Sequence, residues 1–214
     1  MGIITYNDKS FLLSVALITL CCFIFVKPEV LKVHDDPIHL PAARTALYLA
    51  LFLLSIVIVF RTVPYGVGLV VIPVVLLFAD RRALKMVDYP LLLTFVFFFI
   101  FSGNMARIDV IRDFFSMLLD KSTLLFSVLS CQFISNVPSA ILLSQFTDNY
   151  PQLLVGVNIG GTGTLIASLA SLITFREYTH NNPTKTGYYV RMFSAFNFGF
   201  LVILTGFMLL LYAL

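Results

Sequence analysis

The sequence is dominated by long apolar stretches that contain no charged residue. They cover residues 10–26, 45–60, 62–79, 89–106, 122–147, 150–175 and 192–214. A helix that spans the hydrocarbon core of a bilayer needs about 20 mostly apolar residues. Because 59% of the residues are hydrophobic and only 12% are charged, a soluble fold of this size cannot bury so much apolar surface. The sequence therefore predicts an all-α integral membrane protein, with residues 1–214 as a single membrane domain in contact with the lipid bilayer.

Five of these stretches read as ordinary transmembrane helices. They are predicted over residues 10–26, 45–60, 62–79, 89–106 and 191–214. The first is a retained helix rather than a cleaved signal, since no small-x-small cleavage site follows it. Residues 107–121 have apolar positions at helical spacing among charged residues. This pattern fits an amphipathic helix at the membrane interface, and it fits equally a helix end with a connecting turn.

The stretch 122–147 is interrupted in its middle by Ser135, Asn136, Val137 and Pro138. Each half has about a dozen residues, which is too short to cross a bilayer alone. Two shapes fit this pattern. One is a single helix kinked at Pro138, and the other is a re-entrant hairpin with its tip at Ser135 and Asn136.

The stretch 150–175 is interrupted by the run Gly160-Gly161-Thr162-Gly163-Thr164. Glycines weaken a helix at its centre, so this run predicts a discontinuous helix. In lipid, a broken backbone persists only where protein or a water-filled cavity surrounds it. The alternative is that the small residues simply let neighbouring helices approach closely.

The distribution of Lys and Arg distinguishes the two shapes of 122–147. With a hairpin the chain crosses six times, and the side of the N-terminus holds five basic residues: Lys9, Arg61, Arg107, Arg112 and Lys121. The other side holds nine: Lys27, Lys32, Arg44, Arg81, Arg82, Lys85, Arg176, Lys185 and Arg191. A full crossing would change the tally to eight against six and nearly remove the bias. The positive-inside rule thus favours the hairpin and puts both termini on the outer face.

The two interruptions carry neutral hydrogen-bonding side chains, namely Ser135, Asn136, Asn158, Thr162 and Thr164. A broken helix offers N–H groups that suit an anion at one end and carbonyl groups that can coordinate Na⁺ at the other. Transporters use this arrangement near the bilayer midplane. We therefore expect ion or substrate ligands at these positions.

Other functions are disfavoured by what the spans lack. No Asp, Glu, Lys, Arg or His lies deep in a predicted span. An intramembrane enzyme needs a positioned base or metal ligands, so we expect no enzymatic activity and no cofactor besides Na⁺ as a coupling ion. The net charge of +3 gives no support for nucleic-acid binding.

The run Ser135-Asn136-Val137-Pro138-Ser139-Ala140, followed by Asn158-Ile159-Gly160-Gly161-Thr162-Gly163-Thr164, resembles the ion transporter superfamily. That superfamily includes citrate and dicarboxylate transporters, arsenite permeases and related anion permeases. Its members have two inverted repeats, each with a re-entrant hairpin and a broken helix. The chain resembles the C-terminal repeat only, specifically over residues 87–214.

The resemblance implies roles for individual residues. Ser135, Asn136, Val137 and Pro138 match the hairpin tip that ligates ion and substrate. The facing helix break is matched by Asn158, Gly160, Gly161, Thr162, Gly163 and Thr164. Ser135, Asn136 and Gly161 are the candidate Na⁺ ligands. Because dicarboxylate members carry Thr where Val137 stands, the Asn-Val-Pro form is closer to the arsenite-type and anion-permease branch.

The resemblance also implies the function and the partners. We expect a secondary active transporter, or half of one, in the plasma membrane, which moves a small anion coupled to Na⁺ or H⁺. At 214 residues the chain has about half the length of a family member. We therefore expect a second transporter half, a truncated reading frame, or a homodimer. The alternative function is a non-transporting membrane subunit or an inactive remnant.

Overall fold

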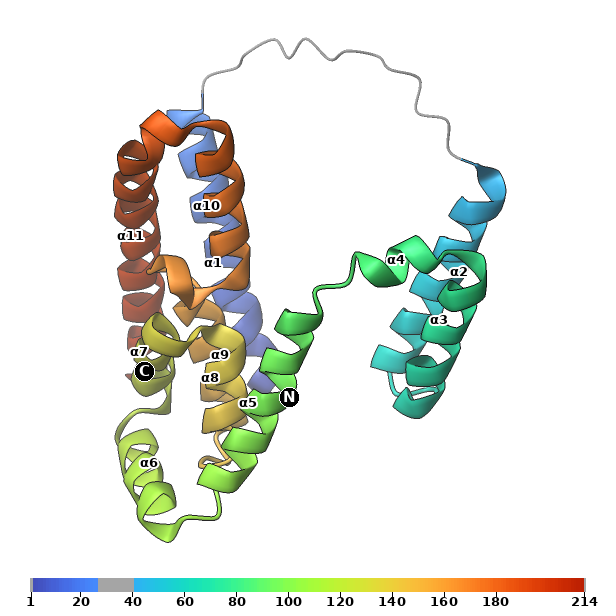
Figure 1. Ribbon diagram of the computed structural model, residues 1–214. Helices are drawn as coiled ribbons and strands as arrows, with labels where there is room; N and C mark the ends of the chain where they lie inside the picture. The colour runs from blue at the N-terminus through green and yellow to red at the C-terminus, as the bar shows by residue number, and fades with distance from the viewer. Residues whose placement is uncertain (1, 27–40, 214) are drawn as a thin grey trace. The chain divides into compact units, whose positions relative to one another are not determined.

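The computed structural model describes residues 2–26 and 41–213, which fold into α-helices and short 3₁₀ helices (Figure 1). The α-helices are α1 (Gly2–Phe25), α2 (Ala42–Val59), α3 (Tyr65–Ala79), α4 (Arg81–Lys85), α5 (Tyr89–Met105), α6 (Asp109–Lys121), α7 (Thr123–Ile134), α8 (Asn136–Leu143), α9 (Tyr150–Gly160), α10 (Leu169–Asn181) and α11 (Thr186–Ala213). The 3₁₀ helices are η1 (Leu165–Ala167) and η2 (Pro183–Lys185). The described ranges contain no strand, so the prediction of an all-α fold is confirmed. Lys27 and Lys32 of the charge tally lie outside the described residues.

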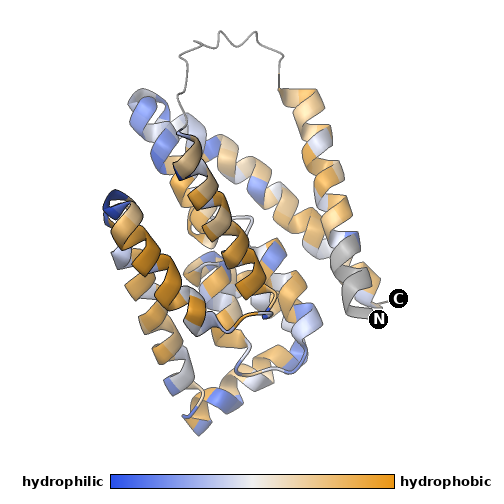
Figure 2. Ribbon diagram, turned by 90° about the vertical axis from the view of Figure 1, so that its right-hand side faces the viewer, coloured by the Kyte–Doolittle hydropathy of each residue, from blue (hydrophilic) through white to orange (hydrophobic). Residues whose placement is uncertain are grey.

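Two helices of the described ranges have the length and composition of membrane spans. Among the described residues, Ala42–Val59 and Pro183–Ala213 are each long and apolar enough to cross a bilayer. The helices α5 and α6 qualify only as a pair, and they are bent by 96° at the break between them. Apolar residues run along the helices and hydrophilic residues gather near their ends (Figure 2). These features are those of a multi-pass membrane protein, and the six crossings inferred from charge stay a prediction.

The helices form two compact units, one of Met1–Lys27 with Leu93–Leu214 and one of Pro28–Leu92. In the second, smaller unit, α2 packs against α3. The hydroxyl of Tyr48 on α2 donates to the Asp80 carboxylate across 2.9 Å. Asp80 also caps α4, because its other oxygen accepts from the backbone N–H of Arg82. The hydrogen bond from Tyr48 holds the pKa of Asp80 below its ordinary value.

In the larger unit, α7 and α9 lie between two clusters of buried apolar side chains. The first cluster joins α6, the α7–α8 segment and α9 and consists of Leu119, Cys131, Leu142, Leu143, Phe146, Leu153 and Val157. The second joins α7, α9 and α11 and consists of Leu124, Val128, Val155, Ile159, Leu204 and Met208. The side chains of Leu13 and Leu17 on α1 pack against the second cluster. The core of this unit therefore surrounds the two interrupted stretches.

The contact between α7 and α9 depends on two glycines one helical turn apart. A Cβ atom at Gly156 would lie 2.7 Å from the Cβ of Ser127 and 2.9 Å from the carbonyl oxygen of Leu124. A Cβ atom at Gly160 would lie 2.7 Å from the sulfur of Cys131. Small residues at this spacing let helix backbones approach closely. Gly160 thus allows two helices to approach closely, as the alternative interpretation of the glycine run expected. Helix α9 also ends at Gly160.

Residues 109–121 form the amphipathic helix α6. Its side chains Phe115 and Leu119 pack against the first cluster, with the rings of Phe115 and Phe146 stacked at 4.9 Å between centroids. On its exposed side, Arg112 pairs with Asp109 at 2.7 Å. Its location at a membrane interface stays a prediction.

Candidate functional site

The interruption in residues 122–147 is the tip of a helical hairpin. Helix α7 ends at Ser135, which has a positive φ of 71°, and Pro138 lies in the first turn of α8, where a missing N–H is tolerated. The hydroxyl oxygens of Ser130 on α7 and Ser139 on α8 lie 3.0 Å apart. Ser130 lies five residues before Ser135 and Ser139 lies four residues after it, so this hydrogen bond requires the two helices to run side by side (Figure 1). The segment is therefore a helical hairpin and not a single kinked helix, and its re-entrant placement in a membrane stays a prediction.

The interruption in residues 150–175 is a break between α9 and α10. Residues 161–164 are non-helical, the short η1 follows, and α10 begins at Leu169. Gly163 has a φ of +107°, a left-handed conformation that favours glycine over other residues. Thr162 donates its hydroxyl to the carbonyl of Ile159 at 2.7 Å. The predicted discontinuous helix is thus confirmed, with the break beginning directly after Gly160.

The hairpin tip contacts the helix break. A Cβ atom at Gly161 would lie 3.0 Å from the side-chain nitrogen of Asn136. The hydroxyl of Ser135 donates to the carbonyl of Ala167 in η1 across 3.3 Å. The Asn136 side-chain oxygen accepts from the N–H of Val137 at 2.9 Å. The structure therefore brings together the three candidate Na⁺ ligands, Ser135, Asn136 and Gly161.

Gln132 on α7 is the residue that the sequence analysis missed. Its amide nitrogen donates to the carbonyls of Gly160 at 2.9 Å and Thr162 at 3.1 Å. Its amide oxygen accepts from the backbone N–H of Thr164 at 2.9 Å. A polar side chain in an apolar helix is costly unless it has hydrogen-bond partners. The single glutamine of α7 could therefore have been predicted to have such partners.

The side chain of Asn158 faces away from the contact between α7 and α9. It lies on the face of α9 opposite Gly156 and Gly160, since two residues along a helix correspond to a rotation of about 200°. Its exposed side chain instead lines a groove of about 480 Å³ between α1, α9 and α11. Other polar groups at this groove are Ser10, Ser14 and Thr162, and its walls are apolar. The predicted site residues thus fall into two groups on different sides of α9. Thr162 belongs to both groups, because its carbonyl accepts from Gln132 and it also lines the groove.

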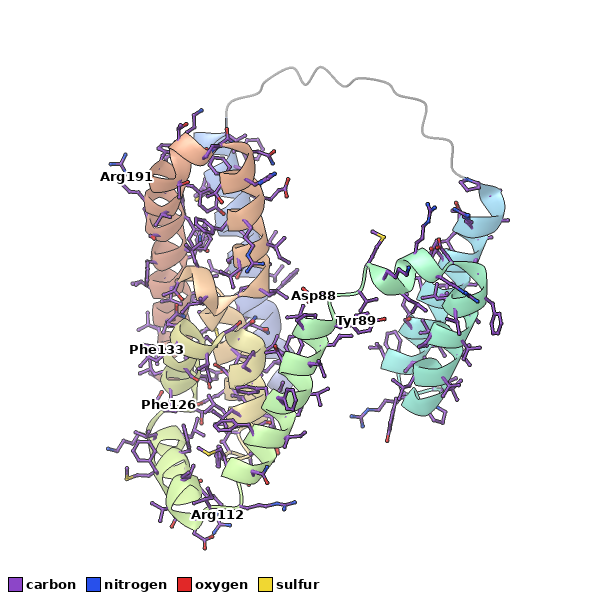
Figure 3. The ribbon with its side chains drawn as sticks, viewed as in Figure 1. Asp88, Tyr89, Arg112, Phe126, Phe133 and Arg191 are labelled. Atoms are coloured by element: carbon purple, nitrogen blue, oxygen red, sulfur yellow. The ribbon has the colours of Figure 1, made fainter. Side chains whose placement is uncertain are left out.

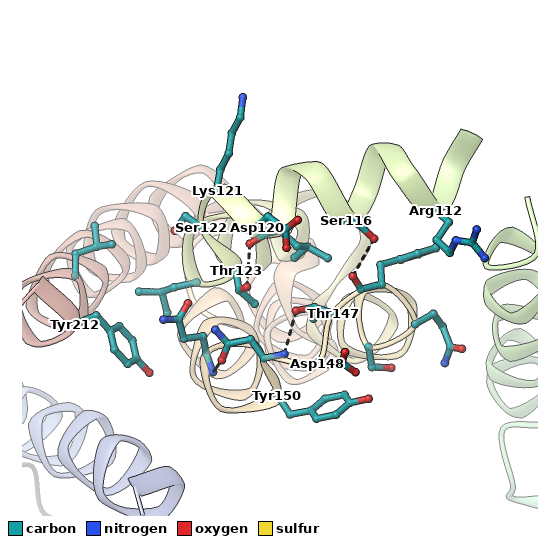
Figure 4. Close-up of a pocket in the computed structure, with 18 residues that line it drawn as sticks. Arg112, Ser116, Asp120, Lys121, Ser122, Thr123, Thr147, Asp148, Tyr150 and Tyr212 are labelled. Carbon is teal, nitrogen blue, oxygen red and sulfur yellow. Dashed lines mark hydrogen bonds between the residues drawn. The ribbon is translucent and has the colours of Figure 1, made fainter. Parts of the chain in front are cut away.

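A second hollow lies at the other end of the hairpin (Figure 4). It has a volume of about 950 Å³ and is lined by the junction of α6 and α7, the loop between α8 and α9, and the end of α11. Charged side chains of both signs border it, including Asp120, Lys121 and Asp148. None of the predicted site residues lines this hollow.

The two interrupted stretches themselves are uncharged. Stretches 122–147 and 150–175 hold no Lys, Arg, Asp, Glu or His. Within residues 2–26 and 41–213, no three His, Cys, Asp or Glu side chains are grouped as metal ligands. The polar atoms available are hydroxyls, side-chain amides and backbone groups, which are ligands for a hard cation.

Exposed apolar side chains surround the hairpin tip. Phe133 is 78% exposed and extends outward from α7 (Figure 3), and Ile134, Val137 and Ile166 are also exposed. On α11, Arg191 likewise extends outward (Figure 3). The polar tip is therefore bordered by a surface suited to lipid or to another protein.

Two known membrane proteins are similar to this chain. It is 38% identical over 129 residues to the uncharacterized transporter MJ0456 of Methanocaldococcus jannaschii, an alignment that covers 60% of this chain and 36% of that protein. It is 35% identical over 112 residues to the inner membrane protein YbiR of Escherichia coli, covering 51% of this chain and 30% of that protein. The alignments span about a third of the length of these relatives. No family model and no solved structure matches the chain.

The fold and the two relatives together define a class of protein. The chain is an all-α, multi-pass membrane protein that is similar in sequence to a membrane transporter. The second relative, YbiR, is itself an inner membrane protein by name.

Proposed function

We propose that this chain is a secondary active transporter, or half of one, and that it moves a small anion coupled to Na⁺ or H⁺. The proposal includes membership in the ion transporter superfamily, as its C-terminal repeat. The similarity to a protein named as a transporter supports the general class. The substrate and the coupling ion are inferred from the site.

The contact of Asn136 with Gly161 carries the proposal. This contact joins a helix start at the hairpin tip to a helix end at the break. A helix start carries partial positive charge and a helix end carries partial negative charge. An anion and a cation can therefore bind side by side at one place, as coupled transport requires.

The absence of charged residues in the interrupted stretches favours a cation as the counter-charge. A helix start supplies only about half an elementary charge, which does not neutralise a bound anion in a low-dielectric site. A co-transported Na⁺ supplies the remaining positive charge. We propose Ser135, Asn136 and Gly161 as its ligands, with Val137, Pro138 and the break residues 160–164 shaping the site.

The partner and the orientation are part of the same proposal. A midplane site in such transporters lies between two repeats, so we propose a second transporter half or a homodimer as the partner. The exposed apolar side chains Phe133, Val137 and Ile166 beside the tip suit that contact. We place the protein in the plasma membrane with both termini on the outer face.

Uptake into proteoliposomes tests the function. The chain is purified together with the proteins encoded by its neighbouring reading frames. Uptake of citrate, arsenite and sulfate is then measured with a Na⁺ gradient or a pH gradient. Asn136→Ala and Gly161→Ala should reduce uptake strongly. Asn181→Ala and Gly199→Ala are matched controls, because Asn181 is exposed on α10 and nothing lies within 4 Å of a Cβ at Gly199. Unchanged uptake in both site variants would disprove the proposed site.

Native mass spectrometry of the detergent-extracted complex tests the partner. A co-purifying second half, or an even-numbered assembly of this chain, is the expected result. A lone monomer would contradict it and would favour the non-transporting alternative.

A further inference from the structure

The Gln132 amide lies inside the helix break and is saturated with hydrogen bonds. Three carbonyl oxygens converge on its nitrogen: Val128 at 3.1 Å, Gly160 at 2.9 Å and Thr162 at 3.1 Å. A primary amide has two N–H donors, so three acceptors compete for two protons. Convergence of three carbonyls on one polar atom is unusual for a side chain placed merely to fill space.

The other end of the amide fixes its orientation. The side-chain oxygen of Gln132 accepts from the backbone N–H of Thr164 at 2.9 Å. The Thr164 hydroxyl in turn donates to the backbone carbonyl of Gln132 at 3.1 Å. An amide turned by 180° would set its N–H₂ group against the N–H of Thr164 and its oxygen against the carbonyls. Only one orientation satisfies all partners.

The backbone at the break is shaped to receive this side chain. A Cβ atom at Gly163 would overlap the Gln132 amide oxygen, and Gly163 has the positive φ that glycine favours. Without the amide, the carbonyls of Gly160 and Thr162 and the N–H of Thr164 would each lose this partner. Unpaired backbone groups are costly in an apolar environment, and a neutral amide can satisfy both kinds at once.

We infer that Gln132 is a positioning residue that sets the geometry of the helix break and ties it to the hairpin. Its amide holds the carbonyls at residues 160 and 162 in one place, and these flank Gly161, where the hairpin tip makes its contact. As a consequence, α7 and the break move as one body. The effect on ion binding rests on the proposed function, whereas the effect on the break does not.

The test compares Gln132→Met with wild type by hydrogen–deuterium exchange of the purified complex. Methionine keeps the length and approximate volume but offers no amide. In Gln132→Met the segment 161–167 should exchange about tenfold faster or more, the factor that corresponds to about 1.4 kcal/mol. Gln145→Met is the matched control, because Gln145 is exposed at the end of α8. Wild-type exchange in Gln132→Met would overturn the inference, since a space-filling role is preserved by methionine.

Gln132→Glu separates the two ends of the amide when exchange is measured at a pH that ionises the new carboxyl group. The carboxylate can still accept from the Thr164 N–H, but it repels the carbonyls of Gly160 and Thr162. Faster exchange at residues 160–163 with Thr164 still protected, resolved by fragmentation of the labelled peptide, would support the inference. Equal protection throughout would overturn it.

Transport kinetics extend the test to the site. If the wild-type complex transports, both Gln132 variants should raise the half-saturating Na⁺ concentration more than they lower the maximal rate. An unchanged half-saturating concentration would overturn the link to the ion site. A wild-type complex without transport, together with accelerated exchange in Gln132→Met, would refute the proposed function and uphold the role of Gln132 in the break.

Discussion

Gly156 on α9 lies directly against Ser127 on α7, so that a Cβ atom at Gly156 would stand 2.7 Å from the Cβ of Ser127. The carbonyl oxygen of Leu124 would lie only 2.9 Å away. A backbone atom cannot rotate aside as a flexible side chain can. At this point of the contact, the separation of the two helices therefore depends on the absence of a side chain at Gly156.

Gly156→Ala should destabilise the protein by about 1–3 kcal/mol, because overpacking a buried contact forces the two backbones apart. Thermal or SDS-induced unfolding of the purified protein measures this loss. Gly199→Ala on α11 is the control, since its Cβ would meet nothing within 4 Å. That control should keep or raise stability, because alanine is the better helix former by about 1 kcal/mol. Equal stability of the two variants would refute the close contact.

Ser139→Ala should lower stability by about 1 kcal/mol, the typical net value of a hydrogen bond. Ser139 is fully buried, and its hydroxyl oxygen lies 3.0 Å from that of Ser130. The double variant Ser130→Ala/Ser139→Ala should cost less than the sum of the single changes, because both remove the same bond. Strict additivity in an unfolding assay would mean that the two hydroxyls do not interact.

Gly163→Ala should be destabilising for two reasons, which a double variant separates. The positive φ of Gly163 costs an alanine of order 1–3 kcal/mol, and the new methyl group would displace the amide of Gln132. In a Gln132→Ala background only the backbone cost remains. The Gly163→Ala penalty in unfolding measurements should therefore be smaller in that background than in wild type. The same penalty in both would show that the amide does not reach Gly163.

Asp80 should titrate below the ordinary range of an aspartate, since the Tyr48 hydroxyl donates to its carboxylate and lowers its pKa. A lowered folded-state pKa contributes stability above the unfolded-state pKa, and this is lost as the pH falls through the folded-state pKa. Tyr48→Phe should therefore move the Asp80 pKa upward. NMR of ¹³C-labelled aspartate carboxyl groups measures the change, with Asp113 as an internal reference. An unmoved Asp80 pKa would refute the hydrogen bond.

The sequence was informative where proline and glycine residues determine the local backbone conformation. Pro138 either kinks a helix or stands near its start, and Gly161 and Gly163 weaken a helix, so interruptions at both places were predictable. The basic-residue tally then favoured the hairpin over a kink, and the Ser130–Ser139 hydrogen bond agrees with it. The interruptions depend on residues adjacent in sequence, and the choice of a hairpin depends on the number of Lys and Arg residues on each side. Neither prediction requires knowledge of tertiary contacts.

Features that depend on distant partners were not predictable. Gln132 finds its acceptors 28 and 30 residues away, and nothing in the local pattern names them. Asn158 was predicted to belong to the helix break together with residues 160–164, yet its side chain lines the groove between α1, α9 and α11. The proximity of α1 to this groove likewise follows from packing, since nothing in the sequence of α1 indicates which helices it contacts.

The bonds of the Gln132 amide oxygen and amide nitrogen to the break close loops of only 28 to 32 residues. Loop-closure entropy grows only slowly with length, and structures with short sequence separations form quickly. The hairpin and the broken helix can thus assemble as soon as residue 164 has left the ribosome. During biosynthesis, this pair can therefore form before α11 is inserted.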